Sequence, residues 1–278
     1  MRGLLTPMID SHVHLNRQEF DGDWRGVAAR AAEAGVRGFL NVGFDPDSSA
    51  ASLALAEADP RILATVGVHP HDAALLADAE GRRTDAGETV LAQLETWAAH
   101  PRVVAIGEIG LDFFRDLSPR PAQRTALALQ LKLAERTGLP VVFHIRDAWT
   151  ETLALIDQLG VPSRGGILHA FSGDAASVDW ARARGFLLGI GGPVTYKKSG
   201  LPDLVAKAGL DLLLLETDAP WLPPVPWRGK RNESAYLAHT CAKVAECLDR
   251  SEADIAAETT AAFCRLMNVT AGPDGLAT

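Results

Sequence analysis

The chain has 278 residues, 47% of them hydrophobic, and carries a formal net charge of −8 at pH 7. This length lies in the range of single-domain α/β barrels and allows a large buried core. The negative charge argues against a broad basic surface for duplex DNA and against a membrane surface as partner, so any contact with nucleic acid should be local. We therefore expect one domain, over residues 1–270.

The cysteines and the hydropathy of the chain indicate neither a disulfide framework nor a membrane anchor. No apolar run reaches about 18 residues, and the apolar start of the chain is too short for a signal peptide. The cysteines Cys241, Cys247 and Cys264 have no CxxC spacing and are interpreted as buried thiols. We expect a soluble cytoplasmic protein without an obligate protein partner, and a disordered tail at residues 271–278.

Eight short apolar runs divide the sequence, each bounded by Gly, Pro or charged residues. Such runs suit strands that are buried on both faces, and each is too short for a helix. They are Met8–His14, Val36–Gly43, Ile62–Val68, Val103–Ile109, Pro140–Ile145, Gly166–Phe171, Phe186–Ile190 and Leu212–Thr217.

Amphipathic, alanine-rich stretches separate these runs and predict helices. They are Asp23–Glu33, Pro46–Ala58, Glu88–Ala99, Arg120–Arg136, Ala148–Leu159, Ala175–Ala183 and Leu201–Ala208. Two closing helices follow, Ser234–Leu248 and Ser251–Met267, each with a serine as its expected N-cap. Strict alternation through eight units predicts a single α/β domain, a (β/α)8 TIM barrel, with a doubly wound open sheet as the alternative.

The first strand ends in Asp10-Ser11-His12-Val13-His14, in which two histidines are two residues apart. Side chains alternate between the faces of a strand, so the imidazoles of His12 and His14 point to the same side and can share one ion. Taken alone, this spacing is weak evidence for a metal, because two such histidines also occur by chance or as a satisfied polar pair. The pair is informative only together with the other strand ends.

Further residues of metal-ligand type end other apolar runs, and in a barrel these ends meet at the rim that carries the active site. They are Glu108, His144, His169 and Asp218, and His69 follows the third run. Four histidines and two carboxylates exceed the needs of one ion with an open position, which predicts two divalent ions bridged by Glu108. Nitrogen and oxygen ligands without thiolate suit Zn, Mn, Co or Ni, with Mg also possible.

The joint pattern of DSHVHL, GVHPH, GEIGLDFF, HIRDA, HAFSG, ETDAP and RGKRNE, spread from Asp10 to about Met267, resembles the TatD family of metal-dependent deoxyribonucleases in the amidohydrolase superfamily. The resemblance implies one metal held by His12, His14, Glu108 and Asp218, and a second held by Glu108, His144 and His169. It also implies exonucleolytic removal of nucleotides from a 3′ end. Ser234 departs from the proline expected in many relatives.

We therefore expect hydrolysis of DNA phosphodiester bonds at single-stranded ends by a two-metal hydroxide mechanism. Asp218 would orient or deprotonate the attacking water, with Glu216 in support, and Asp10 would support the ligands from a deeper position. One alternative is an ester or amide hydrolase, such as an aminoacyl-tRNA deacylase, because the same chemistry attacks carbonyls. A metal-binding adaptor is another, but it should have lost a ligand, and none is lost.

Substrate contacts are expected from residues around this rim. Arg146 is two residues beyond His144 and is interpreted as a phosphate clamp, with a structural ion pair as the alternative. His69 is expected to contact phosphate and His71 to cap a loop. Lys230 and Arg231 lie in a basic segment after the last strand that either binds substrate or is simply solvated. Four rim aromatics either stack on bases or pack in the core, namely Phe113, Phe114, Trp221 and Trp227.

Overall fold

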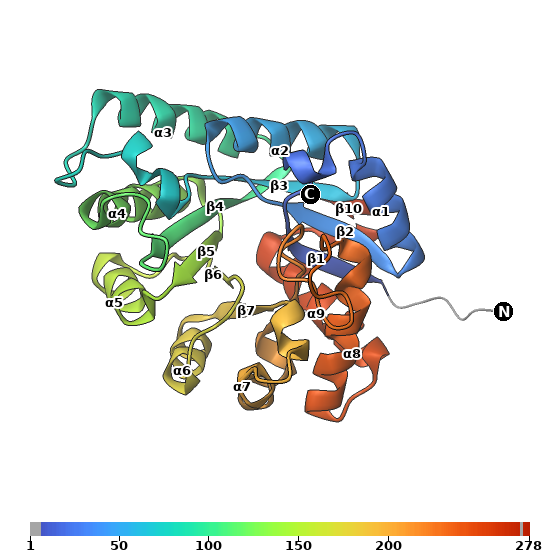
Figure 1. Ribbon diagram of the computed structural model, residues 1–278. Coiled ribbons are helices and arrows are strands. Elements are labelled where there is room, and N and C mark those ends of the chain that lie inside the picture. The colour runs from blue at the N-terminus through green and yellow to red at the C-terminus, as the bar shows by residue number, and fades with distance from the viewer. Residues whose placement is uncertain (1–6, 273–274) are drawn as a thin grey trace.

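Eight parallel strands lie side by side in chain order in the computed structural model, which describes residues 7–272 and 275–278 (Figure 1). Each strand coincides with one predicted run. Phe186–Ile190 has the predicted bounds, and the other seven strands differ from their runs by one to three residues at one or both ends. The strands are β1 Met8–Val13, β2 Val36–Asn41, β3 Ile62–Val66, β4 Val103–Asp112, β5 Val141–Arg146, β6 Gly166–Leu168, β7 Phe186–Ile190 and β8 Leu213–Leu215.

Backbone hydrogen bonds between β1 and the segment after β8 close the barrel. Val13 forms a parallel bridge with Ala219, and the His14 amide donates to the Ala219 carbonyl at 2.9 Å. The Asp218 amide donates to the His12 carbonyl, also at 2.9 Å. The predicted (β/α)8 barrel is therefore confirmed, and the alternative, a doubly wound open sheet, is excluded. The same hydrogen bonds bring the first and last predicted ligands of the chain together.

Helices form the outer layer around the strands (Figure 1). They are α1 Trp24–Glu33, α2 Pro46–Ala58, α3 Asp85–Ala98, α4 Arg120–Thr137, α5 Trp149–Leu159, α6 Ala175–Arg184, α7 Leu201–Ala208, α8 Leu237–Leu248 and α9 Glu252–Met267. Short 3-10 helices lie between them, namely η1 Gln18–Phe20, η2 Pro70–Leu75, η3 Gly192–Thr195, η4 Leu210–Leu212 and η5 Ser234–Tyr236. No helix of the described residues is long and apolar enough to cross a membrane.

The two serines expected as N-caps have different roles. Ser251 caps α9 as predicted, because its hydroxyl accepts from the Asp254 amide while the Asp254 carboxylate accepts from the Ser251 amide. Ser234 does not cap α8, which begins after η5. Its hydroxyl instead donates to Asp10 Oδ2 at 2.7 Å, so the local capping signal is overridden by a partner 224 positions away in the sequence.

A cluster of apolar side chains fills the barrel beneath the rim. Val142, Ile167 and Leu214 belong to it, together with Phe263 and Met267 of α9. Residues two apart on a strand share a face, so these three strand residues point to the same side as His144, His169 and Glu216. The apolar side chains therefore fill the barrel interior directly beneath the polar residues of the rim.

The C-terminal segment differs from the disorder that we expected for residues 271–278. β9 Thr270–Gly272 and β10 Gly275–Ala277 pair as an antiparallel hairpin. Leu276 is buried, and its amide donates to the Pro60 carbonyl at 2.9 Å. It fills a space left by Gly38, where a Cβ would lie 2.8 Å from the leucine. Residues 273–274 lie outside the described residues. So do residues 1–6, at the apolar start of the chain, which we expect to be too short for a signal peptide.

Candidate active site

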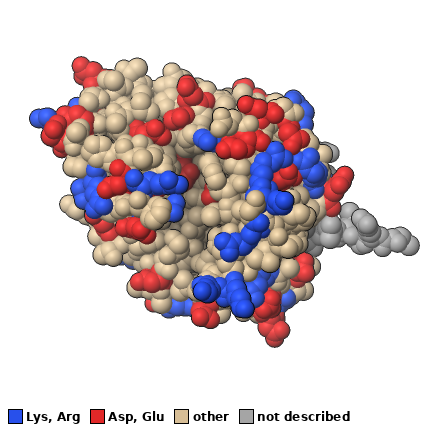
Figure 2. All heavy atoms as spheres, in the orientation of Figure 1, with Lys and Arg blue, Asp and Glu red and all other residues tan. Residues whose placement is uncertain are grey.

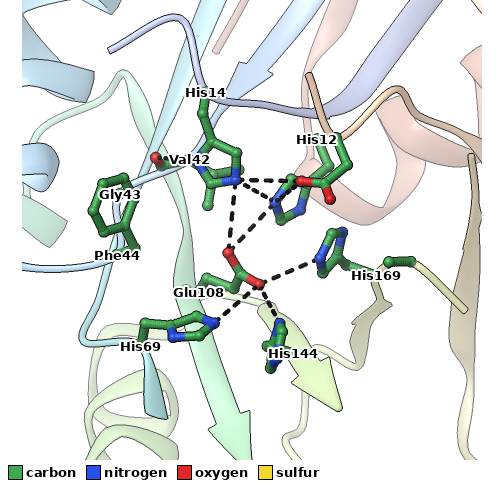
Figure 3. A network of polar contacts seen from close by, with 12 residues as sticks. His12, His14, Val42, Gly43, Phe44, His69, Glu108, His144 and His169 are labelled. Carbon is green, nitrogen blue, oxygen red and sulfur yellow. Dashed lines mark hydrogen bonds and ion pairs between the residues drawn. The ribbon is translucent and has the colours of Figure 1, made fainter. Parts of the chain in front are cut away.

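The six predicted ligands come together at the carboxyl ends of the strands. Figure 3 shows Glu108 in the middle, with His12 and His14 on one side and His69, His144 and His169 on the other. Glu108 lies in β4, a central strand, and its side chain is 5% exposed. Parallel strands that end at one rim bring together residues that are up to about two hundred positions apart, which is how this cluster forms.

One half of the cluster surrounds Glu108 Oε2 and Asp218 Oδ1. His12 Nε2 and His14 Nε2 are 3.1 Å apart. Glu108 Oε2 lies 3.5 Å from His12 Nε2 and 3.8 Å from His14 Nε2, and Asp218 Oδ1 lies 3.8 Å and 3.5 Å from the same two atoms. Ligand atoms around one Zn-sized ion are about 3 to 4 Å apart, so His12, His14 and Glu108 are spaced to hold a single ion, and Asp218 lies beside the same two histidines.

The other half surrounds Glu108 Oε1. His144 Nδ1 lies 2.9 Å from this oxygen, His169 Nε2 lies 3.3 Å away and His69 Nε2 lies 3.7 Å away. The two oxygens of one carboxylate thus face two separate groups of imidazoles. This is the arrangement of a carboxylate that can bridge two ions.

Three of the histidines have a hydrogen-bond acceptor on the side of the ring that faces away from the cluster, as metal-binding histidines usually do. The ring nitrogen that faces away from the cluster has an acceptor: Val42 O at 3.3 Å for His14, Asp112 Oδ2 at 3.0 Å for His144 and Glu216 Oε1 at 3.2 Å for His169. With an ion bound, the proton of each ring would lie on the nitrogen that donates to this acceptor, and the nitrogen facing Glu108 would be free to bind the metal. The residues present therefore fit divalent metal ions.

His69 differs from these three histidines because its ring nitrogen that faces away from the cluster accepts a hydrogen bond. Its Nδ1 accepts a hydrogen bond from the backbone amide of His71 at 3.1 Å, so in the neutral ring the proton is on Nε2, the atom that faces the cluster. Burial, together with the nearby His144, lowers the pKa of His69 well below its usual value, which keeps the ring neutral. His69 therefore presents a hydrogen-bond donor to the pocket.

Asp112 belongs to the site and was not singled out from the sequence. It is fully buried, and its Oδ2 contacts His71 Nε2 at 2.8 Å as well as His144. Burial would raise the pKa of Asp112, but the hydrogen bond from His144 and the backbone amide of Arg115 outweigh it and hold the pKa well below its usual range. His71, expected to cap a loop, instead contacts this carboxylate. Asp112 was missed because the strand was predicted to end at Ile109, whereas β4 continues to Asp112.

The two deeper carboxylates support the cluster in ways that the sequence did not specify. Asp10 accepts hydrogen bonds from the Thr217 amide at 2.9 Å and from the hydroxyls of Thr217 and Ser234, so it fixes the chain just before Asp218. Burial raises the pKa of Asp10 to about 7. Glu216, expected to assist Asp218, instead accepts from the Ala170 amide at 2.6 Å and orients His169.

A cavity of about 540 Å³ opens over the cluster. Figure 2 shows a hollow in the centre of this face with Lys and Arg side chains on either side of it. Arg17, Arg115 and Arg146 line the cavity, and the Arg146 guanidinium lies 3.9 Å above the Phe114 ring. Arg146, which was expected at the rim, thus lines the cavity above the cluster.

Lys230 and Arg231 do not line the cavity. Arg231 is held by the carboxylates of Glu233 and Asp23 and lies over the Phe20 ring. The placement of Arg231 differs from the substrate contact that we expected, because two acidic side chains already neutralise its guanidinium. Lys230 is exposed.

The four rim aromatics divide into two pairs. Phe114 and Trp221 are 57% and 41% exposed, and Trp221 lines the cavity. Phe113 packs against the main core, while Trp227 stacks on Tyr236 at 4.6 Å, outside the cavity. Of the four, Phe113 packs against the core, whereas Phe114, Trp221 and Trp227 keep exposed ring surface.

A barrel whose strand ends converge on histidines and carboxylates in this geometry defines a metal-dependent hydrolase. The family model described as TatD related DNase matches residues 9–268, and the chain therefore belongs to this family. The family and its curated members show that the protein is a hydrolase.

Similar proteins extend over nearly the whole chain. The chain is 36% identical to the uncharacterized metal-dependent hydrolase YabD of Bacillus subtilis, over 94% of this chain and 99% of the relative. It is 38% identical to the 3′-5′ ssDNA/RNA exonuclease TatD of Citrobacter rodentium, over 95% and 98%. The crystal structure of YJJV, a TatD homologue from Escherichia coli, superposes with a TM-score of 0.86 at 32% identity, covering 95% of this chain and 98% of that one.

Proposed function

We propose that the protein is a 3′-5′ exonuclease that removes nucleotides from single-stranded DNA ends with the help of two divalent metal ions. The observation that carries this proposal is the position of Glu108, whose two oxygens face two groups of imidazoles. His12, His14, Glu108 and Asp218 would hold one ion, and Glu108, His144 and His169 the other. Zn, Mn, Co, Ni and Mg are all candidates for this mixture of nitrogen and oxygen ligands.

When bound, the ions would lower the pKa of water and offset charge on the phosphate. The residues of the chain supply the remaining steps. Asp218, whose side chain is 13% exposed at the edge of the cluster, would accept the proton of the attacking water. His69 would donate a hydrogen bond from Nε2 to a phosphate oxygen, and Arg146, which lies over Phe114, would contact a second oxygen of the same phosphate.

The shape and lining of the cavity support a single strand end as substrate. A volume of about 540 Å³ suits a ligand of roughly nucleotide size, because small-molecule sites span ~300–1,000 Å³. Phe114 and Trp221 offer exposed aromatic faces on which unstacked bases can lie. The printed name of the relative from Citrobacter rodentium agrees with this substrate class.

One assay tests the proposal against its main competitor. Metal-reconstituted protein is incubated with 5′-labelled single-stranded DNA, an aminoacyl-tRNA and a neutral carboxylic ester, with and without a chelator. We expect progressive shortening of the DNA from its 3′ end, loss of activity on chelation and recovery with a divalent ion. Faster cleavage of the aminoacyl bond than of DNA would make the protein an ester hydrolase, and full activity after chelation would exclude the metal centre from the reaction.

A further inference from the structure

Arg17 is one of two arginines of the cavity, with Arg115, that the proposed reaction does not use. It follows the ligand His14 by three residues, and its amide donates to the His14 carbonyl at 3.0 Å. The intervening turn is fixed, since Asn16 Nδ2 donates to the carbonyls of Val42 and Ser48 at 3.1 and 3.0 Å. A side chain on such a turn is positioned before any ligand arrives.

The guanidinium of Arg17 lies between two aromatic rings. Its Cζ is 5.4 Å from the centre of Phe44 and 5.3 Å from the centre of Trp221. Both rings in turn contact the His14 imidazole, with ring centres 5.6 and 5.0 Å apart. Arg17 is therefore one layer of side chains farther out than the cluster, on the wall formed by the β1 and β8 loops.

The charge of Arg17 is only partly compensated. Its Nε lies 3.4 Å from Glu19 Oε2 but has no hydrogen-bond partner within the described part of the chain, and the Nη atoms form no ion pair there. The side chain is 30% exposed and lines the cavity. A guanidinium that lies between two rings and has free Nη donors presents a planar fork that fits a phosphate.

We infer that Arg17 binds the phosphodiester next to the one that is cleaved, on its 5′ side, and so makes the enzyme prefer strands with at least two phosphates. This inference rests on the proposed exonuclease function. The cleaved phosphate has its own partners in the cluster, His69 and Arg146. Arg17, one layer beyond the ligand His14, is placed for the next anion along the same strand, and the exposed Trp221 contacts both His14 and Arg17.

The test compares a dinucleotide, which has one phosphodiester, with a trinucleotide, which has two. For Arg17→Gln we expect kcat/KM to fall about 10- to 100-fold on the trinucleotide, the range for a charge-assisted contact, and less than threefold on the dinucleotide. A trinucleotide whose 5′ linkage, the one not cleaved first, is an uncharged methylphosphonate should be cleaved poorly by the wild type and equally poorly by the variant. The metal content of the variant should be unchanged.

Arg25→Gln is the matched control. Arg25 also lies over an aromatic ring, 4.1 Å from the centre of Trp24, but it does not line the cavity, so its loss should change neither substrate. Equal losses of Arg17→Gln on the dinucleotide and trinucleotide would make Arg17 a support for Trp221 and overturn the inference. No loss on either would also overturn it. Failure of the wild type to cleave both oligonucleotides would instead refute the exonuclease function itself.

Discussion

Asp112 Oδ2 lies 3.0 Å from Nε2 of His144, on the opposite side of the imidazole from Glu108. The same oxygen contacts His71, and Asp112 Oδ1 accepts from the amides of Phe114 and Arg115 at 2.9 and 2.7 Å. A carboxylate anchored in this way holds the ring in one tautomer and increases the basicity of the nitrogen that faces the cluster.

Asp112→Asn should therefore weaken metal binding at the half of the cluster that contains His144 and His169. Loss of such a supporting carboxylate typically lowers metal affinity by about 10- to 100-fold, and the half that contains His12 and His14 should be unaffected. Calorimetric titration of metal-free protein would show one weakened and one unchanged binding event. Asp211→Asn, at an exposed ion pair with Arg182, is the control, and identical titrations of the Asp112 variant and the wild type would refute the prediction.

Glu108→Gln should reduce the occupancy of both ions, because an amide is a much poorer bridging ligand than a carboxylate. Each oxygen of Glu108 faces a different group of histidines, so a single substitution affects both halves. Metal analysis after dialysis measures this directly. If only one ion were lost, Glu108 would be a ligand of one site and not the bridge.

Arg146→Ala should leave the metal content unchanged and lower kcat/KM on DNA by roughly 10- to 100-fold, because the guanidinium is placed to contact phosphate. Arg146→Lys should restore only part of this loss, since an ammonium lacks the planar fork and the stacking on Phe114. A neutral ester assayed in the same preparation should be affected far less. Equal losses on DNA and ester would mean that Arg146 shapes the site without recognising phosphate.

Glu233→Gln should lower stability at neutral pH but not in acid. Burial would raise the pKa of Glu233, but the hydrogen bonds from Arg30, at 2.7 and 2.9 Å, and from Arg231 lower it below its usual value of 4.5. A lowered pKa stabilises the fold above the pKa of the unfolded chain, and this stabilisation is lost as the pH falls through the folded pKa.

The expected loss for Glu233→Gln is about 1 to 2 kcal/mol at pH 7, a charge-assisted value reduced because both arginines are partly exposed. Urea unfolding at pH 7 and near pH 3 should show this difference shrinking as the pH falls. Glu246→Gln, at an exposed pair with Lys243, should have almost no effect. A difference between wild type and Glu233→Gln that was constant with pH would show that the carboxylate is not stabilised by its charge.

The sequence alone determined the barrel and the six residues of the cluster. The apolar runs are short and continuous because the strands are buried on both faces, and they alternate with amphipathic helices. Once the strands are parallel, their carboxyl ends must meet at one rim. The position of Glu108 or His169 at the end of its run is therefore enough to place it, without any knowledge of side-chain packing.

Tertiary structure decided the contacts that join residues far apart in the chain. Ser234 reads locally as a helix cap but donates to Asp10, and Arg231 reads as a substrate contact but pairs with Glu233 and Asp23. A hydroxyl or a guanidinium has many possible partners, and only the fold brings one of them within reach. Asp112 shows the same limit, because its role depends on the orientation of His144 across two neighbouring strands.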